Sequence, residues 1–421
     1  MPDEEDLDAR DLVDPLAEVR DRFELPADLY LDGNSLGPVS DAAQASLESA
    51  FEEWRTLGVR AWTEADPPWF EYGTRLGAKL APFVGAGPEE CVVTGGTTVN
   101  IHSLIGAFLD ATDGNTVLVD ELDFPTDHYA IRAQLRARGH DPEKGLVSVE
   151  SRDGRTIHHE DLIAQMEDHR PDVVFLPSVL YRSGQRLDVE RLTRAAHDVG
   201  AVIGFDLAHS VGLIPHELGA HGVDFAVWCS YKYLNAGPGA IAGLYLNDDH
   251  FDLSPGLPGW WGNDDATQFE LNPHYEPAPD ASRFEISTVP VFSAAPLFGS
   301  LDVLDEAGIH AVHDQSQVLT ARLIQGVDDE LAEYGYAVGT PRAPGERGGH
   351  VAIEHDAAAA ISAALRDQGV IVDYRPPNVV RVCPAPLYTS VDDVEAAIDA
   401  LREVVATGRY TQYRDADDTV T

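Results

Sequence analysis

Residues 202–239, VIGFDLAHSVGLIPHELGAHGVDFAVWCSYKYLNAGPG, contain two short apolar runs that each lead into polar side chains. The first run ends at Asp206, with His209 close behind it. The second spans Val223 to Trp228 and is followed by Ser230-Tyr231-Lys232 and a glycine-rich turn. Apolar runs of this length, bounded by turn residues, predict buried strands. The polar residues then lie at the strand ends.

Lysine is rare in this chain. Of the 29 Lys and Arg residues only Lys79, Lys144 and Lys232 are lysines, and the last of these stands beside a tight loop. Arginine cannot replace lysine where an amine must condense with a carbonyl group. The position of Lys232 therefore indicates a chemical role.

An acid at the end of one strand and a lysine after the next are the pair that a pyridoxal phosphate enzyme needs. Asp206 would keep the pyridine nitrogen of the cofactor protonated, and the amine of Lys232 would form the Schiff base. Taken singly, Asp206 could cap the following helix, and Lys232 could be a surface lysine. Their combination with Tyr231 and His209 favours the cofactor site.

Apolar runs and helical patterns alternate through the middle of the chain. Strands are predicted at 116–119, 146–149, 172–176 and 241–245, and helices at 41–57, 74–84, 126–138, 158–168 and 188–198. This order is typical of an α/β fold around a parallel sheet. Residues 1–29 form an acidic lead-in with a helical pattern. Helices to about 307 and at 310–333 lead into a C-terminal α/β unit.

The composition limits the class of protein. Asp and Glu outnumber Lys and Arg by 72 to 29, and the formal net charge of −43 argues against nucleic acid and anionic membranes as partners. A hydrophobic fraction of 44% nevertheless indicates a folded chain. Scarce lysine beside abundant acids indicates adaptation to high salt, where screening weakens self-repulsion.

The cysteines, the apolar runs and the histidines give further expectations. Cys91, Cys229 and Cys383 are isolated in hydrophobic contexts, which predicts core packing in a reducing compartment. No apolar run approaches the roughly 18 residues of a membrane span. The acidic N-terminus is unlike a targeting signal, so a cytoplasmic location is expected. No metal site is predicted, because the histidines lack partners at metal-ligand spacing.

Two further loops carry candidate cofactor contacts. VVTGGTTVNIHSLIGAFL (92–109) reads as strand, glycine-rich turn and helix, and the helix N-terminus with Thr97 and Thr98 would receive a phosphate. Thr97 could equally be the helix N-cap. In DFPTDHY, Phe124 could stack on a flat ring and Asp127 could reach its polar substituents. The same residues also fit a helix that starts with proline.

Other residues are candidates for the walls of a pocket. Ser178 follows a strand at the carboxyl edge of the predicted sheet, where α/β proteins bind ligands. Trp62 could pack in the core or line a pocket for an aromatic substrate. Trp260 and Trp261 lie in a Pro/Gly loop, which favours a ligand or dimer contact. Arg381 stands inside an apolar strand and must find an anion, either a structural partner or a substrate carboxylate.

Several segments of the chain resemble kynureninase. The likeness rests on YLDGNSLGP (30–38), LYRSGQRLD (180–188), FDLAHSVG (205–212), DFAVWCSYKYLNAGPG (224–239) and RVCPAPLY (381–388). It extends from about Tyr30 to Leu401 and implies a fold-type I enzyme that uses pyridoxal 5'-phosphate to hydrolyse L-kynurenine, 3-hydroxy-L-kynurenine or both. The products would be anthranilate or 3-hydroxyanthranilate, and L-alanine, in tryptophan catabolism and NAD biosynthesis.

The resemblance also implies an architecture. Residues 1–45 would form an N-terminal arm that joins the small domain, and 46–295 a large domain around a mainly parallel seven-stranded sheet. Residues 296–421 would form the smaller α/β C-terminal domain. A homodimer is implied, because Trp260 would bond the cofactor phosphate of the partner subunit.

Site residues follow from the motifs and the resemblance together. The expected cofactor contacts are Thr97, Thr98, Phe124, Asp127, Ser178, Asp206, His209, Tyr231, Lys232, Trp260 and Thr288. The expected substrate contacts are Arg381, Trp62, Asn34 and Ser287. Lys232, Asp206 and Tyr231 would be catalytic, and Arg381 would bind the α-carboxylate, whereas Arg375 is expected to be a solvated or interface charge. Thr288 and Asn263 stand where the family commonly has Asn and His, respectively.

Two alternatives remain open on sequence alone. A class V aminotransferase or a cysteine desulfurase would share the lysine, although a desulfurase needs a nucleophilic cysteine on a mobile loop and Cys383 lies in a predicted strand. A cofactor-binding regulatory protein without turnover is the other alternative, supported only by the departures at Asn263 and Thr288. Kynurenine and 3-hydroxykynurenine are not distinguished.

Overall fold

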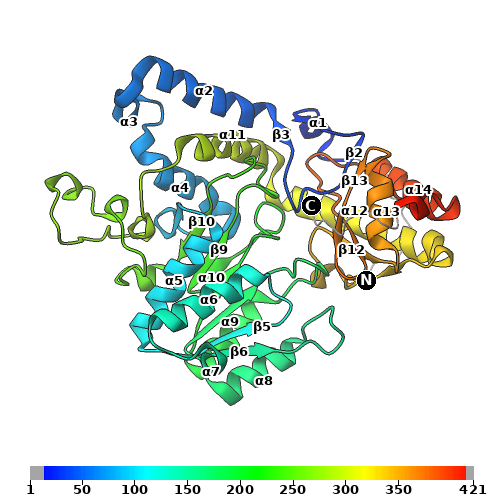
Figure 1. The fold of residues 1–421 in the computed structure, drawn as a ribbon. Helices are drawn as coiled ribbons and strands as arrows, with labels where there is room; N and C mark the ends of the chain where they lie inside the picture. The colour runs from blue at the N-terminus through cyan, green and yellow to red at the C-terminus, as the bar shows by residue number, and fades with distance from the viewer. Residues whose placement is uncertain (1–13, 414–421) are drawn as a thin grey trace, which may run out of the picture.

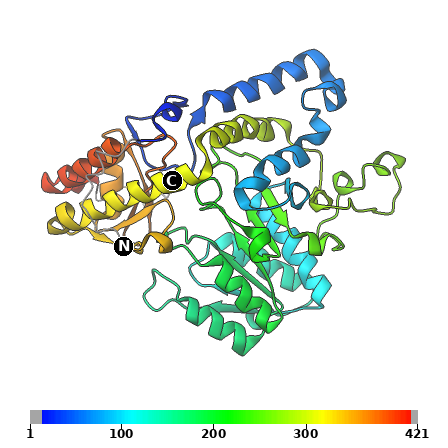
Figure 2. The same ribbon diagram turned by 180° about the vertical axis from the view of Figure 1, so that it is seen from behind.

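A computed structural model describes residues 14–413, which form a larger unit around one sheet and a smaller unit around another (Figure 1). Seen from behind, the smaller unit again lies to one side of the larger (Figure 2). The predicted helical lead-in is wrong over its described part, because only α1 (Ala17–Arg20) is helical before the short strand β1 (Phe23–Glu24). Residues 1–13 of that prediction lie outside the described residues.

The main sheet has seven strands in the order β4-β10-β9-β8-β7-β5-β6. Their bounds are β4 Cys91–Val93, β5 Val117–Asp120, β6 Leu146–Val149, β7 Val173–Pro177, β8 Val202–Asp206, β9 Phe225–Trp228 and β10 Gly243–Leu246. β10 runs antiparallel to both of its neighbours, whereas β9, β8, β7, β5 and β6 pair in parallel. The mainly parallel seven-stranded sheet that the family resemblance implies is confirmed.

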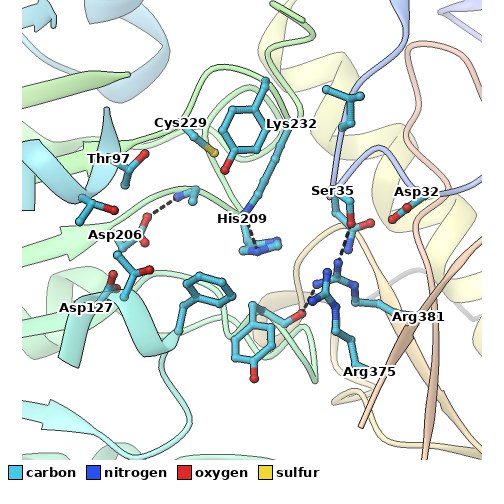
Figure 3. A pocket seen from close by; sticks show the side chains of 18 of the residues that line it. Asp32, Ser35, Thr97, Asp127, Asp206, His209, Cys229, Lys232, Arg375 and Arg381 are labelled. Carbon is cyan, nitrogen blue, oxygen red and sulfur yellow. Dashed lines mark hydrogen bonds between the residues drawn. The ribbon is translucent and has the colours of Figure 1, made fainter. Parts of the chain in front are cut away.

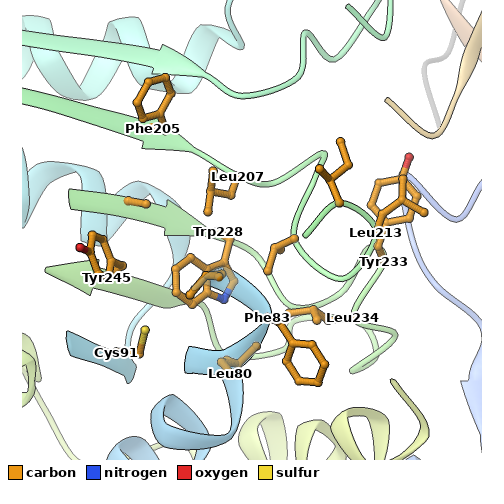
Figure 4. Close-up of a cluster of buried hydrophobic side chains, with 14 of the residues drawn as sticks. Leu80, Phe83, Cys91, Phe205, Leu207, Leu213, Trp228, Tyr233, Leu234 and Tyr245 are labelled. Carbon is orange, nitrogen blue, oxygen red and sulfur yellow. The ribbon is translucent and has the colours of Figure 1, made fainter. Parts of the chain in front are cut away.

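Helices cover both faces of this sheet, because side chains alternate along each strand. Val117 and Val119 of β5 pack with α5 (Thr97–Thr112) and α6 (Pro125–Ala137), whereas Leu118 belongs to the cluster on the opposite face. That second cluster includes α4 (Tyr72–Val84), α8 (His159–His169) and α9 (Val189–Val199). Trp228 is fully buried there, close to Leu80 (Figure 4). Burial of the strands on both faces explains their continuous apolar runs.

The smaller unit is built on an antiparallel sheet in the order β11-β12-β15-β14. Its strands are β11 Ala337–Val338, β12 Val351–Glu354, β14 Asp373–Arg375 and β15 Val379–Val382, and its helices are α12 Ile309–Gly326, α13 Ala358–Arg366 and α14 Val391–Ala406. The N-terminal segment joins this unit: β2 (Leu29–Tyr30) pairs in parallel with β13 (Val370–Ile371), and Leu31 lies in the smaller core. Asp32 is thereby placed opposite Cys383.

Two long helices, α2 (Asp41–Leu57) and α11 (Val291–Ala307), run side by side along the top of the molecule (Figures 1 and 2). The contact is close at Gly299, where an added Cβ would lie 2.0 Å from the carbonyl oxygen of Ala42. α11 therefore packs against the larger unit although it spans residue 295. The domain boundaries at 45 and 295 stay predictions.

Candidate active site

A cavity of about 660 Å³ opens where the carboxyl ends of β8 and β9 face the smaller unit. The main sheet contributes Asp206, which ends β8, and Cys229 to Lys232, which follow β9. The smaller unit contributes Arg375 and Arg381, and the N-terminal segment contributes Tyr30, Asp32, Asn34, Ser35 and Leu36. Figure 3 shows these groups converging from three parts of the chain. The carboxyl edge of a parallel sheet is where this class of fold binds ligands.

Lys232 extends into the cavity from the turn after β9, where Asn235 and Gly237 adopt positive φ angles. Its Nζ lies 2.9 Å from Nε2 of His209. Burial lowers the pKa of Lys232, although the neighbouring Cys229 and Asp206 act in the opposite direction. Burial and the charge of Lys232 hold the pKa of His209 well below its usual range. The neutral imidazole can therefore accept a hydrogen bond from the amine.

Asp206 and Asp127 point toward one another below the lysine (Figure 3). The Oδ1 atom of Asp206 accepts a hydrogen bond of 2.7 Å from the amide of Ala208. Burial raises the pKa of Asp206, while Lys232 and a hydrogen bond with Asp127 lower it. Burial and the charge of Asp206 raise the pKa of Asp127 well above its usual range. Of the two carboxyl groups, Asp127 is therefore the one that holds a proton more tightly.

The N-terminus of α5 forms the wall beside this pair. The helix begins at Thr97, its N-cap is Gly96, and no side chain caps it. Thr97 and Thr98 both line the cavity. The alternative that Thr97 serves as the N-cap is therefore wrong. Uncapped amides and two hydroxyl groups at a helix N-terminus form a suitable site for a phosphate.

Arg381 lies on the opposite wall, on β15. Its Nε and Nη2 atoms donate to the two carboxylate oxygens of Asp373 at 3.1 and 2.5 Å, and Nη1 donates to the carbonyl oxygen of Tyr181 at 2.6 Å. Arg375 also lines the cavity and donates to Asp373 from Nε and Nη2. The expectation that Arg375 is a solvated or interface charge is wrong. Its guanidinium group donates two hydrogen bonds to the buried carboxylate of Asp373 at the cavity wall.

Of the other expected contacts, Asn34, Phe124 and Tyr231 line the cavity. Asn34 is fully buried, and neither polar atom of its side chain has a hydrogen-bond partner. Phe124 precedes α6 and remains 45% exposed at the cavity wall. Both arrangements leave these side chains available to a ligand.

The remaining expected contacts do not line the cavity within this chain. Ser178 is buried behind it, bonded to the carbonyl oxygen of Asp206 and to Ser210. Trp62 packs in an aromatic cluster with Trp69, Phe70 and Trp261. Trp260 donates to the carbonyl oxygen of Gln268. Ser287 and Thr288 line a separate cavity of about 130 Å³ beside Gly95.

Sequence reasoning missed several residues of the site, among them Asp32, Tyr181, Cys229 and Asp373. Asp32, Tyr181 and Cys229 line the cavity, and Asp373 holds its arginines. Asp373 could have been found from the segment VIVDYR (370–375). An acid inside an apolar strand requires a partner, just as Arg381 does. Cys229 gave no such signal, because a small apolar side chain next to a strand reads as core.

The residues of this cavity fit pyridoxal phosphate. A volume of about 660 Å³ lies within the range of roughly 300–1,000 Å³ that is usual for ligand sites. The amine, the paired carboxyls and the helix N-terminus match an aldehyde, a ring nitrogen and a phosphate. Buried polar atoms without partners, Nδ1 of His209 and Oδ2 of Asp127, also face this region. Among residues 14–413 no cluster of His, Cys, Asp and Glu side chains could hold a metal ion, and no helix is long and apolar enough to cross a bilayer.

Comparisons with known proteins give relatives over the whole chain. The family model described as "Kynureninase C-terminal domain" matches residues 312–401. A kynureninase of Geobacillus thermodenitrificans is 44% identical over 412 residues, which cover 97% of this chain and 96% of that protein. Among solved structures, the cysteine desulfurase of Thermococcus onnurineus NA1 has a TM-score of 0.76 at 20% identity, with 93% and 98% of the two chains covered. A C-DES mutant with glycine covalently linked to its pyridoxal phosphate cofactor has a TM-score of 0.74 at 17% identity, with 91% and 98% covered.

The N-terminal segment of the site yields a prediction. Burial, and to a lesser extent Asp373, raise the pKa of Asp32 from 3.8 to about 6. The folded chain thus binds this proton more tightly than the unfolded chain does. Ionised Asp32 destabilises the fold above about pH 6 and has no such effect below about pH 4. Asp32→Asn should therefore gain up to about 2 kcal/mol of unfolding free energy at about pH 8 relative to about pH 4.5.

Denaturant unfolding at the two pH values measures this gain. Asp28→Asn, at an exposed position of the same segment, is the control and should show no such difference between the two pH values. A gain for Asp32→Asn that is equal at both values would contradict the buried, proton-binding environment of Asp32.

Proposed function

The chain belongs to the kynureninase family, and we propose that the cavity described above binds its cofactor and its substrate. The protein is a pyridoxal 5'-phosphate-dependent hydrolase that splits L-kynurenine, its 3-hydroxy derivative or both into the aromatic amino acid and L-alanine. The observation that carries the assignment of the site is the convergence of Lys232, Asp206 and Arg381 on one cavity. Lys232 and Arg381 lie on opposite sides of this cavity (Figure 3).

Asp206 and Asp127 act on the cofactor ring in this proposal. When bound, pyridoxal phosphate supplies an aldehyde for the substrate amine and a ring that draws electrons from the substrate α-carbon. Asp206 is the more readily ionised of the two, because Asp127 holds its proton more tightly and Lys232 lowers the pKa of Asp206. An anion at this position keeps a proton on the ring nitrogen. Thr97 and Thr98, with the α5 amides, hold the phosphate.

Lys232 moves the proton at the substrate α-carbon. A general base must be unprotonated at the working pH, and burial lowers the pKa of Lys232 in that direction. His209 accepts a hydrogen bond from the amine and so orients it. Arg381 binds the α-carboxylate and thereby fixes which substituent of the α-carbon faces Lys232. Tyr231, next to the lysine, bonds the phosphate and relays protons.

The cysteines argue against a desulfurase reaction. The fold likeness to cysteine desulfurases extends to the backbone only, since catalysis there needs a thiolate. Burial raises the pKa of Cys383 to about 12, and this thiol is fully buried beside Tyr233. Burial also raises the pKa of Cys229. Neither thiol has the low pKa and the exposure that a nucleophilic cysteine needs.

A homodimer is the second part of the proposal, supported by an apolar patch on α2, α11 and the short strand just before α2. The patch consists of Val39, Leu47, Phe51, Trp54 and Phe292, which are 39–55% exposed. It borders an apolar groove of about 450 Å³, and Tyr30 and Leu36 line both this groove and the active-site cavity. A second copy seated on the patch would lie next to the cavity. It could then contribute Trp260, Ser287 and Thr288, which do not reach the cavity of their own chain.

Growth at high salt is the third part of the proposal, and it rests on composition. A net charge of −43 on a folded chain produces strong self-repulsion. The screening length falls from about 30 Å at 0.01 M to about 3 Å at 1 M salt. High salt is therefore the condition in which this surface is least destabilising. A cytoplasmic location remains a prediction; among the described residues all three cysteines are free, and cell fractionation would test it.

Lys232→Ala should lower the turnover of L-kynurenine by about 10⁴-fold or more, because among residues 14–413 no other lysine lines the cavity. Formation of anthranilate and L-alanine measures turnover, and 3-hydroxykynurenine, L-cysteine, and an amino acid with a keto acid are run in parallel. Lys144→Ala, whose side chain is exposed, is the control and should retain wild-type rates. After borohydride reduction, mass spectrometry should find the cofactor on Lys232. Retained turnover, or a label elsewhere, would refute the assignment.

Trp54→Glu should convert the dimer to a monomer and lower activity, because it places a charge in the apolar patch. Sedimentation velocity measures the association state. Ala164→Glu adds the same charge at an exposed position of α8, at the opposite end of the molecule (Figure 1), and should remain dimeric. A monomeric wild-type protein with full activity would exclude the dimer proposal.

Lowering the salt concentration should destabilise the wild-type protein. The thermal unfolding midpoint should fall steadily from about 2 M to about 0.01 M potassium chloride as screening is lost. Sucrose at matched viscosity is the control, since it adds no ions. An unchanged midpoint across this range would end the high-salt hypothesis.

A further inference from the structure

A second histidine of the smaller unit lies next to His209. His350 immediately precedes β12, its side chain is fully buried, and it does not itself line the cavity. Its ring contacts that of His209, with the ring centroids 5.6 Å apart and the planes inclined at 63°. The backbone beside it is tied to the larger unit, because the amide of Gly348 donates to the carbonyl oxygen of Gly184 at 2.8 Å. Two imidazole rings therefore meet where the two units join.

Both rings have buried nitrogen atoms that lack a hydrogen-bond partner among the described residues. The Nε2 atom of His209 lies 2.9 Å from Nζ of Lys232, but its Nδ1 atom has no partner. Neither nitrogen of His350 forms a hydrogen bond of ordinary geometry. A buried polar atom without a partner is costly, so a hydrogen bond between the two rings would be favourable.

The surroundings of His350 determine which of its nitrogens can accept. Burial holds the pKa of His350 well below its usual range, and three nearby cations act in the same direction: Arg381, Lys232 and Arg375. The ring is therefore neutral, with one N–H donor and one acceptor nitrogen. The carbonyl oxygen of Tyr181 raises this pKa, because it faces the N–H as an acceptor. The other ring nitrogen is then the one without a proton.

We propose that His350 is a positioning residue, which accepts a hydrogen bond from Nδ1 of His209 and thereby fixes the tautomer of that ring. Ring centroids 5.6 Å apart bring the ring edges close enough that a modest rotation of one ring yields a hydrogen bond of roughly 3 Å. The hydrogen bond made by one nitrogen of a histidine decides which nitrogen carries the proton.

The tautomer of His209 matters for Lys232. With the proton on Nδ1, the Nε2 atom of His209 has a free electron pair and accepts from the amine. The opposite tautomer would present an N–H to the amine and could not accept from it. The inference rests on the proposed function, in which this amine moves the proton at the substrate α-carbon.

Nitrogen NMR tests the tautomer directly, on full-length protein that is labelled with ¹⁵N-histidine and prepared without cofactor. The signals of His209 are assigned by their loss in His209→Gln. Wild-type His209 should show a protonated Nδ1 and an unprotonated Nε2. His350→Leu, which cannot accept a hydrogen bond, should give a mixture of the two tautomers. His350→Gln, whose side chain both donates and accepts, should keep the wild-type pattern.

Turnover of L-kynurenine gives an independent measure. His350→Leu should lower kcat up to about tenfold, the effect of one hydrogen bond, and should change KM less than about twofold because His350 does not line the cavity. In the His209→Gln background the same substitution should have no further effect, since His350 acts through His209. His355→Leu, just beyond the other end of β12, is the control and should retain both the tautomer and the rate.

Three results would overturn the proposal: a wild-type His209 with a protonated Nε2, an unchanged tautomer in His350→Leu, or an equal fall in kcat in both backgrounds. The wild-type tautomer can be read without any variant of His350, so poor folding of His350→Leu would not prevent the test. A wild-type protein that has the expected tautomer but hydrolyses no kynurenine would refute the proposed function alone.

Discussion

The burial of Lys232 beside Asp206 is the constraint on which the rest of the site depends. An amine and a carboxylate are costly to remove from water, and each must be compensated by neighbours that hold a defined charge. His209 is neutral and accepts a hydrogen bond from the amine, while Asp127 takes the proton that would otherwise reside on Asp206. The site therefore places a lysine of lowered pKa beside a carboxyl group whose ionised form Lys232 and Asp127 favour against the effect of burial. The reaction needs a general base and an anionic ring partner together. The protonation state of each depends on these neighbours.

The second constraint is that no single part of the chain can build the cavity. The parallel sheet presents Asp206 and Lys232 at strand ends. The arginines that face them do not come from the loops of this sheet. The smaller unit supplies Arg375 and Arg381 from a rigid antiparallel pair, and the N-terminal segment joins that unit through β2 and β13. Ser35 then bonds both Asp373 and Arg381. Segments that are far apart in sequence are thus fixed by strand pairing, which places side chains more precisely than loops do.

Local chemistry made the main sheet and half of the site predictable. The predicted strands at 146–149 and 202–206 match β6 and β8, and the helix at 41–57 matches α2, because apolar runs and caps are local signals. Lys232, Asp206 and Thr97 were predictable because strand ends and helix starts converge in such a sheet. Arg375 was not, since its inward direction depends on Asp373 and on the pairing of β14 with β15. The helix prediction for residues 1–29 was wrong over its described part for a related reason. Helical spacing in a sequence is only a preference until the helix has a surface to pack against.

Arginine and lysine have different chemical roles in this chain. Ion pairs such as Arg155 with Glu354, and the shared contacts of Asp373, use the planar fork of the guanidinium group. That fork is fixed in charge, which suits a surface of high acidity and a wall that must attract a carboxylate. It can neither lose a proton near neutral pH nor condense with an aldehyde. The one cavity position that requires both properties is occupied by Lys232, so the scarcity of lysine elsewhere makes its function at this position more evident.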